Sequence, residues 1–230
     1  QVWTLIDMFP GRPGMTVIGE NGGIVMRDGV EVSSHPVDTP TVREVIRLVR
    51  EATSGPDGID GGLVMCGKQF AYVERTADRF VDGVLPYYHR TKRVDDQIAI
   101  IDAIEAGEID DMIIKLAVYA IGPIEAFAEA TLARFADTHQ YAVSGANWAD
   151  LQVRGVDKGS AVRDLQRFLG VDRSQTVVFG DAGNDLSMMG VADMSFAMAN
   201  ASQDVVEAAR FIAPSNNEAG VVQVLRTLLG

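Results

Sequence analysis

The sequence predicts an α/β protein in which a doubly wound, mostly parallel, Rossmann-like core sheet carries a second α/β module as an insertion. Two observations predict this class. After residue 153, apolar runs of strand length alternate strictly with helical segments, a rhythm typical of parallel sheets covered by helices. Residues 38–152 hold their own succession of helices and strands, so we expect them to pack as a separate module. Residues 1–37 and 153–230 are therefore assigned to the core.

The first part of the core is expected to be the end of a helix followed by a short antiparallel arrangement. Residues 1–9 are rich in apolar side chains, and a turn of proline and glycine follows them. Asp28 and Gly29 are a pair typical of the two-residue loop of a hairpin. The expected strands lie at residues 15–18, 24–26 and 30–32.

The inserted module is expected to begin where Thr39 and Pro40 open a helix that runs to about Ala52, because proline is favoured in the first turn of a helix. The other helices expected in the module lie over residues 77–89, with interruptions at Gly83 and Pro86, and over residues 123–136. The expected strands lie over residues 62–66, 70–73, 112–119, 140–144 and 151–153. The second part of the core is expected to hold helices over residues 157–169, from 184, over 203–210 and over 219–229, and strands over residues 176–179, 195–199 and 211–213.

The composition of the chain argues against two classes of partner, nucleic acids and membranes. The 230 residues carry a net charge of −12, and an acidic chain disfavours DNA and RNA, so no nucleic-acid partner is expected. An anionic ligand would need a local positive group, such as a metal ion, a lysine or a helix terminus. No apolar stretch approaches the roughly 20 residues of a membrane helix, so no membrane partner is expected either. The single cysteine, Cys66, lies in an apolar run and is expected to be a buried thiol.

The strongest chemical signal is the loop that follows the strand expected at residues 176–179. Asp181 and Asp185 lie four residues apart in the run GDAGND. Ligands gather at the carboxyl ends of parallel strands, and two carboxylates held close there repel each other unless a cation lies between them. Hard oxygen ligands suit Mg²⁺. Alternatively, the loop is a plain turn in which Asp185 caps the next helix. Gly180 and Gly183 favour the first interpretation, because they let backbone approach a ligand.

The second signal is a lysine at the start of a predicted helix. Asp157 is expected to be the N-cap, which puts Lys158 in the first turn, where a cation opposes the helix dipole at a cost of about 0.3–1 kcal/mol. That placement makes sense if the ammonium faces a bound anion. The alternative is an ordinary solvated lysine.

These segments together resemble the haloacid dehalogenase superfamily, and more closely its Cof-type branch of sugar phosphatases. GDAGND at residues 180–185 matches the family's fourth motif, and Lys158 with Gly159 matches the lysine of the third. Glu20, Asn21 and Gly22 match the short motif that precedes the cap, and residues 197–201 match the core segment that follows the fourth motif. The resemblance implies that residues 38–152 form the cap.

The resemblance also implies roles for individual residues. Asp181 would be a direct Mg²⁺ ligand, and Asp185 would support the metal shell directly or through water. Lys158 and Asn184 would be catalytic groups: Lys158 would bind phosphate and screen the nucleophile, and Asn184 would contact the phosphoryl group or order the loop. Asn21 would contact the substrate. The implied enzyme is a cytoplasmic, magnesium-dependent hydrolase of small phosphomonoesters, with sugar phosphates as the expected substrates. We expect it to act on a small phosphorylated metabolite as a monomer or a weak homodimer.

One departure from the family pattern is large. The family's first motif, with its nucleophilic and acid–base aspartates, and the Ser or Thr of its second motif are not found in residues 1–230, and Gln1 aligns where the second motif ends. We therefore expect an upstream segment in the natural protein that carries the nucleophile of an aspartyl-phosphate intermediate. Residues 1–230 alone are expected to be inactive. A phosphomutase, and a non-catalytic binding or regulatory protein that lacks the nucleophile, remain as alternatives.

Three further features are given less specific roles. The run from Tyr87 to Arg93 is basic and aromatic; it could bind sugar hydroxyls or a distal phosphate, or be a solvated helix end. The three histidines have no ligand spacing and are not assigned to a metal. Trp148 and Asp150 lie where the module returns to the core, where they could position a hinge, although core packing is the usual role of a tryptophan.

Overall fold

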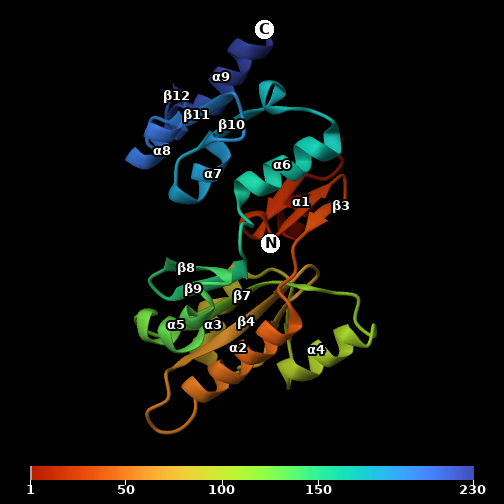
Figure 1. Ribbon diagram of the computed structural model, residues 1–230, viewed down its shortest axis with the longest axis vertical. Coiled ribbons are helices and arrows are strands. Elements are labelled where there is room, and N and C mark those ends of the chain that lie inside the picture. Colours follow the sequence, from red (N-terminus) through yellow and green to blue (C-terminus); the bar gives the residue numbers. More distant parts are fainter. Residues whose placement is uncertain (1) are drawn as a thin grey trace.

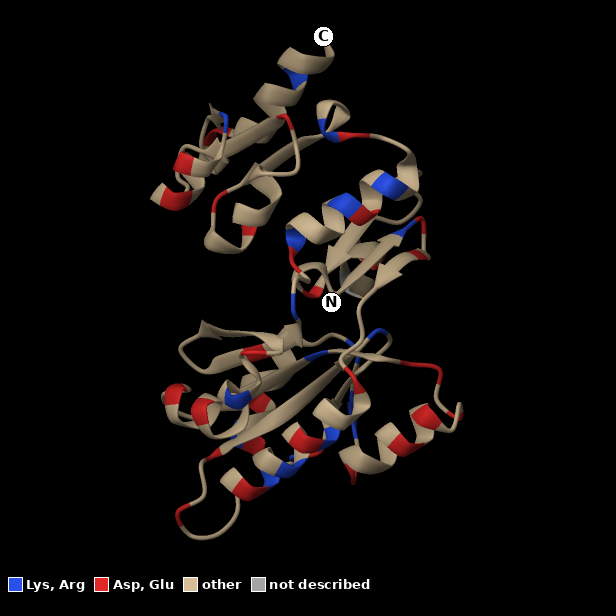
Figure 2. Ribbon diagram, in the orientation of Figure 1, with Lys and Arg blue, Asp and Glu red and all other residues tan. Residues whose placement is uncertain are grey.

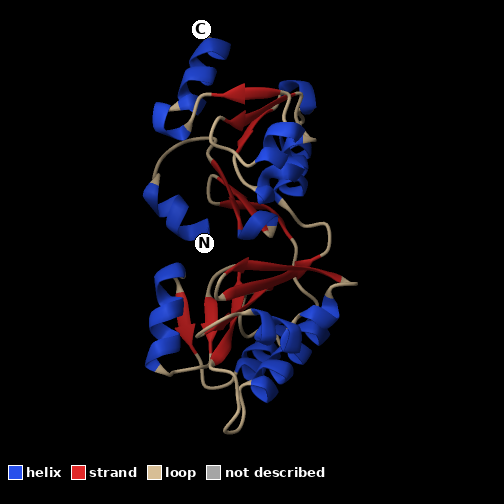
Figure 3. Cartoon of the chain, turned by 90° about the vertical axis from the view of Figure 1, so that its left-hand side faces the viewer, coloured by secondary structure: helices blue, strands red, loops and turns tan. Residues whose placement is uncertain are grey.

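The computed structural model describes residues 2–230 and shows an upper lobe and a lower lobe (Figure 1). The upper lobe contains the elements from α1 to β3 and from α6 to the C-terminus, and the lower lobe contains those from α2 to β9. Both lobes combine helices with sheets, so the predicted α/β class is confirmed (Figure 3). Gln1, at the start of the helix expected over residues 1–9, lies outside the described residues.

The first segment of the upper lobe is a helix followed by a three-stranded antiparallel sheet in the order β1-β2-β3. Asp28 and Gly29 join β2 to β3 with φ angles of 50° and 79°, the left-handed pair that a two-residue hairpin loop requires. The predicted hairpin is therefore confirmed. The elements are α1 (Val2–Met8), β1 (Thr16–Gly19), β2 (Ile24–Arg27) and β3 (Val30–Ser34).

The second segment of the upper lobe alternates helices with a parallel sheet in the order β10-β11-β12. Phe179, Phe196 and Phe211 are neighbours across its strands, and their rings stack with successive centroids 5.1 Å apart. The described strands of this lobe thus form two three-stranded sheets. The elements are α6 (Lys158–Leu169), β10 (Val177–Gly180), α7 (Leu186–Met189), β11 (Met194–Met198), α8 (Gln203–Ala208), β12 (Phe211–Ala213) and α9 (Gly220–Leu229).

The lower lobe is built on a six-stranded sheet in the order β6-β5-β4-β7-β9-β8. Alternate residues of β4 face opposite sides: Leu63 and Met65 pack in the cluster that includes α2, α4 and α5, whereas Val64 and Cys66 pack with α3. Figure 3 shows helices on both sides of this sheet. The elements are α2 (Thr39–Ala52), β4 (Gly61–Gly67), β5 (Ala71–Val73), α3 (Asp78–Val84), β6 (Thr91–Arg93), α4 (Gln97–Glu105), β7 (Ile113–Ala120), α5 (Glu125–Thr131), β8 (His139–Gly145) and β9 (Trp148–Val153).

Helix α2 begins as predicted. Asp38 is its N-cap and accepts a hydrogen bond from the Thr41 backbone N–H at 2.9 Å, and Pro40 lies in the first turn. Its outer face carries charges of both signs (Figure 2), among them Arg47, which lies 2.6 Å from the Glu44 carboxylate. None of the helices in residues 2–230 is long and apolar enough to cross a membrane.

Three expectations for the lower lobe are wrong in detail. The helix expected over 77–89, with interruptions at Gly83 and Pro86, ends at Val84 and gives way to a 3₁₀ turn over Leu85–Tyr87. The break at Pro86 is confirmed, because proline cannot continue the α-helical hydrogen bonds, but Gly83 lies inside α3 and the helix does not resume. The run from Tyr87 to Arg93 is therefore a turn and the strand β6, not a helix end. The helix expected over 123–136 is only Glu125–Thr131. Helix α4 and strand β6 were not predicted.

Candidate active site

The loop after β10 is folded around Asp185, whose residue surface is only 5% exposed. Its carboxylate accepts hydrogen bonds from the backbone N–H groups of Asp181 at 3.0 Å and Ala182 at 3.3 Å. A Cβ atom at position 180 would lie 2.6 Å from the Asp185 Cβ, so only glycine lets the strand end approach this closely. The Asp185 side chain makes no capping bond to α7, but its bond from the Ala182 N–H helps to cap the 3₁₀ turn Gly183–Asp185 that runs into that helix.

Lys158 points into this loop from the start of α6. Its Nζ donates to the Asp185 Oδ1 at 2.5 Å, and its side chain is 29% exposed. Asp157 is the N-cap of α6 and accepts from the Ser160 N–H at 2.7 Å, as the sequence predicted. Lys158 is therefore not the ordinary solvated lysine of the alternative interpretation, because its ammonium faces a nearly buried carboxylate.

A glycine fixes the distance between α6 and the loop. The Gly159 N–H donates to the Ser187 Oγ at 2.9 Å, and a Cβ atom at position 159 would meet the Ser187 carbonyl oxygen at 2.3 Å. Any larger residue would push the first turn of the helix, and Lys158 with it, away from Asp185.

The charge state of Asp185 follows from these contacts. Burial alone would raise its pKa, but the hydrogen bond from Lys158 and those from two backbone N–H groups outweigh burial and hold the pKa below its ordinary value. Asp185 is therefore an anion at neutral pH, paired with the Lys158 cation.

The turn between β1 and β2, which belongs to the antiparallel sheet of the upper lobe, contacts the loop after β10. Asn184 donates from Nδ2 to the Asn21 Oδ1 at 3.2 Å. Asn21 has a φ of 50° and lies in the 3₁₀ turn Glu20–Gly22, which is held from the lower lobe by Gln152, whose Nε2 donates to the Glu20 carbonyl at 2.6 Å. Three segments that are far apart in the sequence thus meet around one point.

These segments surround a hollow of about 610 Å³, which we call the loop hollow. Its lining includes Asn21, Lys158 and Asn184, together with Ser144 and Asp150 of the lower lobe. Asp181 does not line it: this residue is exposed at the end of β10, where its carbonyl accepts from the Ser202 N–H at 2.9 Å. Three of the five predicted site residues therefore line the hollow, namely Asn21, Lys158 and Asn184. Asp185 pairs with the Lys158 Nζ, and the Asp181 N–H donates to Asp185.

A divalent cation would find only part of its ligand set in these residues. Within residues 2–230 no group of three or more His, Cys, Asp or Glu side chains is arranged to hold a metal ion. Mg²⁺ commonly uses one or two protein carboxylates and completes its octahedron with water and phosphate oxygens. Asp181 and Asp185 fit that partial role, and their assignment as metal ligands stays a prediction.

Other predicted features lie elsewhere. The Nε2 atom of His35 lies 3.0 Å from Asp164, and that of His139 lies 3.4 Å from Asp38, both away from the loop hollow. Burial raises the pKa of Cys66 to about 12, so the buried, protonated thiol is confirmed.

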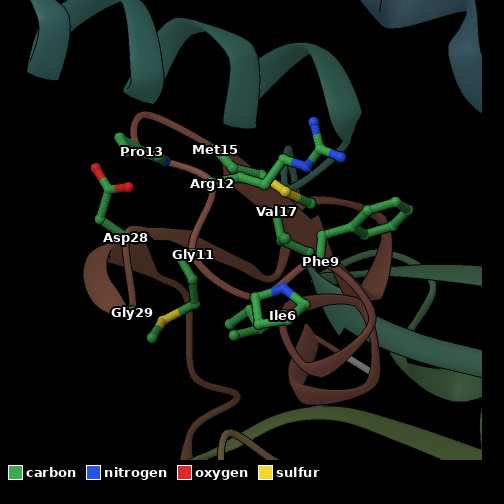
Figure 4. Close-up of a pocket in the computed structure, with 11 residues that line it drawn as sticks. Ile6, Phe9, Gly11, Arg12, Pro13, Met15, Val17, Asp28 and Gly29 are labelled. Atoms are coloured by element: carbon green, nitrogen blue, oxygen red, sulfur yellow. The ribbon is translucent and has the colours of Figure 1, made fainter.

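A separate hollow beside α1 is mainly apolar, with Phe9, Met15 and Val17 on its walls (Figure 4). Its Asp28 carboxylate is occupied by the Gly14 N–H at 2.7 Å, so this hollow shows no comparable chemistry.

Sequence reasoning missed an ion pair between the lobes. Lys115 of β7 places its Nζ 2.6 Å from the Glu20 Oε2 and 3.8 Å from the Asp150 Oδ1, and all three side chains are at most 13% exposed. The signal was present, since Lys115 is a lone charge inside the apolar run Ile113–Val118.

Comparisons with known proteins agree with this geometry. The model of a family described as haloacid dehalogenase-like hydrolase matches residues 7–225. The Escherichia coli (strain K12) 5-amino-6-(5-phospho-D-ribitylamino)uracil phosphatase YbjI is 31% identical over 234 residues, which span 100% of this chain and 80% of that protein.

Two solved structures share the fold. A haloacid dehalogenase-like hydrolase from Bacillus subtilis superimposes with a TM-score of 0.74 at 17% identity, covering 97% of this chain and 83% of that one. The subclass IIB sugar phosphatase BT4131 superimposes with a TM-score of 0.64 at 17% identity, covering 93% and 75%.

Proposed function

This chain belongs to the haloacid dehalogenase-like hydrolases and is an enzyme of the phosphoric monoester hydrolase class, and we propose that it releases phosphate from small phosphorylated sugars with the help of Mg²⁺. The observation that carries the proposal is the Lys158–Asp185 contact at the edge of the loop hollow. An ammonium held there by a fixed carboxylate is a ready-made partner for a phosphoryl group.

The substrate class rests on a chemical feature that the related proteins share by name. YbjI is named for a phosphorylated ribitylamino compound, and BT4131 is named a sugar phosphatase. Both names describe a phosphate on a polyhydroxylated carbon chain. The polar lining of the loop hollow, with Asn21, Gln140 and Gln152, suits such a chain, since amide groups can donate to and accept from hydroxyls.

The proposed reaction has two steps. A carboxylate oxygen of the expected upstream aspartate attacks phosphorus, an O–P bond forms, the ester P–O bond breaks, and the leaving oxygen takes a proton from an acid group. Water then attacks the aspartyl phosphate, which regenerates the carboxylate and releases inorganic phosphate. When bound, Mg²⁺ would supply charge neutralisation to phosphoryl oxygens from the side of Asp181 and Asp185.

The described residues have defined tasks in this reaction. Lys158 binds phosphoryl oxygens and offsets their developing charge, and Asp185 positions its ammonium. Asn184 and Asn21 orient the phosphate and the first carbons of the substrate. The lower lobe covers the hollow with Ser144 and Asp150 and limits the access of water.

Phosphate release tests the proposal. The natural protein is incubated with a panel of sugar phosphates, with and without Mg²⁺ and with chelator. We expect release that requires Mg²⁺ and falls roughly 10²–10³-fold in the Lys158→Met variant. Absence of release from every ester would refute the phosphatase, and conversion of a sugar phosphate into its positional isomer would identify a phosphomutase instead.

We also propose that the protein is cytoplasmic and is a monomer or a weak homodimer. Sedimentation of the purified protein tests the oligomeric state.

A further inference from the structure

The loop hollow continues into a second hollow of about 360 Å³, which we call the aromatic hollow. Asn21, Ser144 and Asp150 line both, so the two spaces adjoin. The remaining residues of the aromatic hollow are Glu20, Tyr87, Tyr88, Lys115 and Trp148. A ligand with its phosphate beside Lys158 would therefore extend its leaving group past Asn21 and Asp150 toward these residues.

One wall of the aromatic hollow is a group of rings. The Trp148 ring lies with its centroid 4.8 Å from that of Tyr119 and 5.9 Å from that of Tyr88, so it is held from two sides. Tyr87 meets Trp148 edge to face at 5.6 Å and 71°, yet 67% of its surface is exposed. An aromatic side chain that is held by one ring contact and otherwise largely exposed can stack on a flat ligand.

The aromatic hollow is also lined by a nearly buried charged group, which consists of Lys115, Glu20 and Asp150. Burial lowers the pKa of Lys115, but its neighbours, including the Glu20 and Asp150 carboxylates, outweigh burial and keep the pKa well above its ordinary value. Its Nζ hydrogen-bonds to Glu20 at 2.6 Å, whereas Asp150 at 3.8 Å is beyond hydrogen-bond distance. An ammonium has three N–H donors, so this cation and the Asp150 carboxylate can still pair with polar atoms of a ligand.

We propose that the aromatic hollow is a subsite for a planar, polar ring carried at the far end of the phosphorylated chain, stacked on Tyr87 and Trp148 with its polar edge toward Lys115 and Asp150. This inference rests on the proposed phosphatase function, because the phosphate must occupy the loop hollow. A hydroxylated chain alone would satisfy the polar side but leave the Tyr87 ring in water. A ring-bearing ester covers both sides, so it is the better substrate.

A matched pair of esters tests the subsite. Flavin mononucleotide and ribitol 5-phosphate share a phosphorylated five-carbon chain and differ in the ring. We expect the natural protein to have a kcat/KM at least about tenfold higher for the ring-bearing ester, since base–aromatic stacking is of that order. Equal kcat/KM values for the two esters would overturn the subsite.

Variants of Tyr87 test whether this residue causes the higher kcat/KM for the ring-bearing ester. Tyr87→Ala should lower kcat/KM for flavin mononucleotide roughly tenfold and leave ribitol 5-phosphate within about twofold. Tyr87→Phe keeps the ring and should retain the preference. Phe168→Ala, which removes another exposed aromatic side chain from α6, should change neither ester. A Tyr87→Ala variant that loses activity on both esters equally would contradict a role confined to the ring.

Failure of the phosphatase proposal can be told apart from failure of the subsite. If no phosphate is released from either ester or from p-nitrophenyl phosphate, the proposed function fails, and titration calorimetry of the two esters then decides the subsite. Tighter binding of flavin mononucleotide that Tyr87→Ala abolishes supports it. Equal binding of the two esters overturns it.

Discussion

The loop hollow and the aromatic hollow share three lining residues, but their side chains come from different kinds of structure. Lys158 and Asn184 lie in a helix start and a strand-end loop, and the backbone of each segment is shaped by hydrogen bonds between residues three or four apart. Their side chains then pair with Asp185 and Asn21, which come from other segments. Tyr87, Lys115 and Trp148 come from a turn and two strands whose pairing sets Tyr119 opposite Trp148. Local turns build the part suited to a phosphate common to all esters, and sheet register builds the part suited to the variable leaving group.

The largest effect is expected at Lys158, which tests whether the loop hollow binds the phosphate of every ester. Replacing it with methionine keeps the length of the side chain and removes the ammonium that we expect to face the phosphoryl group. We expect kcat/KM to fall roughly 10²–10³-fold for every ester, with or without a ring, because charge stabilisation in the transition state is lost. Phosphate release and thermal unfolding measured together separate this loss from unfolding.

The control for that variant is Lys92→Met, which removes an exposed lysine of β6. It should leave kcat/KM within about twofold. If Lys158→Met were equally mild, the loop hollow would not be the site of phosphate chemistry.

The aromatic hollow should respond to Lys115→Met mainly through stability. Both carboxylates beside Lys115 are nearly buried, and removal of this cation takes a compensating charge away from each of them, so we expect a loss of about 3 kcal/mol in the free energy of unfolding. Urea unfolding measures it. Adding Glu20→Gln to the variant should recover part of the lost stability, since one of the two nearly buried negative charges is then removed.

Lys68→Met serves as the comparison, because Lys68 pairs at 2.8 Å with Glu31, a carboxylate that is 38% exposed and can be solvated. Its cost should stay below about 1 kcal/mol. Equal costs for Lys115→Met and Lys68→Met would show that burial of the interlobe pair adds nothing.

Asp185→Asn probes the positioning of Lys158 without removing it. The amide group of an asparagine would oppose either the Lys158 ammonium or the backbone N–H groups of Asp181 and Ala182, so one buried contact must be lost. We expect a loss of about 2 kcal/mol in stability together with a large fall in kcat. An unchanged kcat on folded protein would show that the ammonium needs no positioning group.

The part of the site that could be predicted is the part that local structure determines. The GDAGND loop and the Asp157–Lys158 helix start have strand-end and N-cap signals within a few residues, and both were placed correctly. Helix α4 was missed, although Asp96 caps it, accepting from the Ile98 N–H at 2.8 Å. Its first residue, Gln97, breaks the apolar pattern because it is buried to bond two strand carbonyls, those of Leu63 and Tyr72.

The aromatic hollow could not be predicted, for a related reason. Tyr87 was assigned to the last part of an interrupted helix. The break at Pro86 was predicted, but the position of Tyr87 also depends on the close approach of Gly83 to the Tyr119 hydroxyl. Trp148 meets Tyr119 only because β7 and β9 pair in one register, which no local propensity specifies. Lys115 was visible as a charge in an apolar strand, but its partner Glu20 lies in the other lobe.

Asp38, the N-cap of α2, also has a lowered pKa, but unlike Asp185 it lies outside the loop hollow, and its replacement should have the smallest effect. Burial would raise the pKa of Asp38, but hydrogen bonds from Thr41 and the nearby His139 outweigh it and hold the pKa below 3.8. The stability that Asp38 adds by capping α2 is therefore present above pH 3.8 and lost as pH falls through the lower pKa of the folded state. Asp38→Ala should cost about 1 kcal/mol at pH 7. This cost should be smaller at an acidic pH below 3.8, where Asp38 becomes protonated in the folded state. Urea unfolding at both pH values measures it, while kcat/KM per folded molecule at pH 7 should not change. A fall in kcat/KM would mean that an ordinary helix cap at the entrance to the lower lobe also controls the loop hollow, and the separation of the two regions would fail.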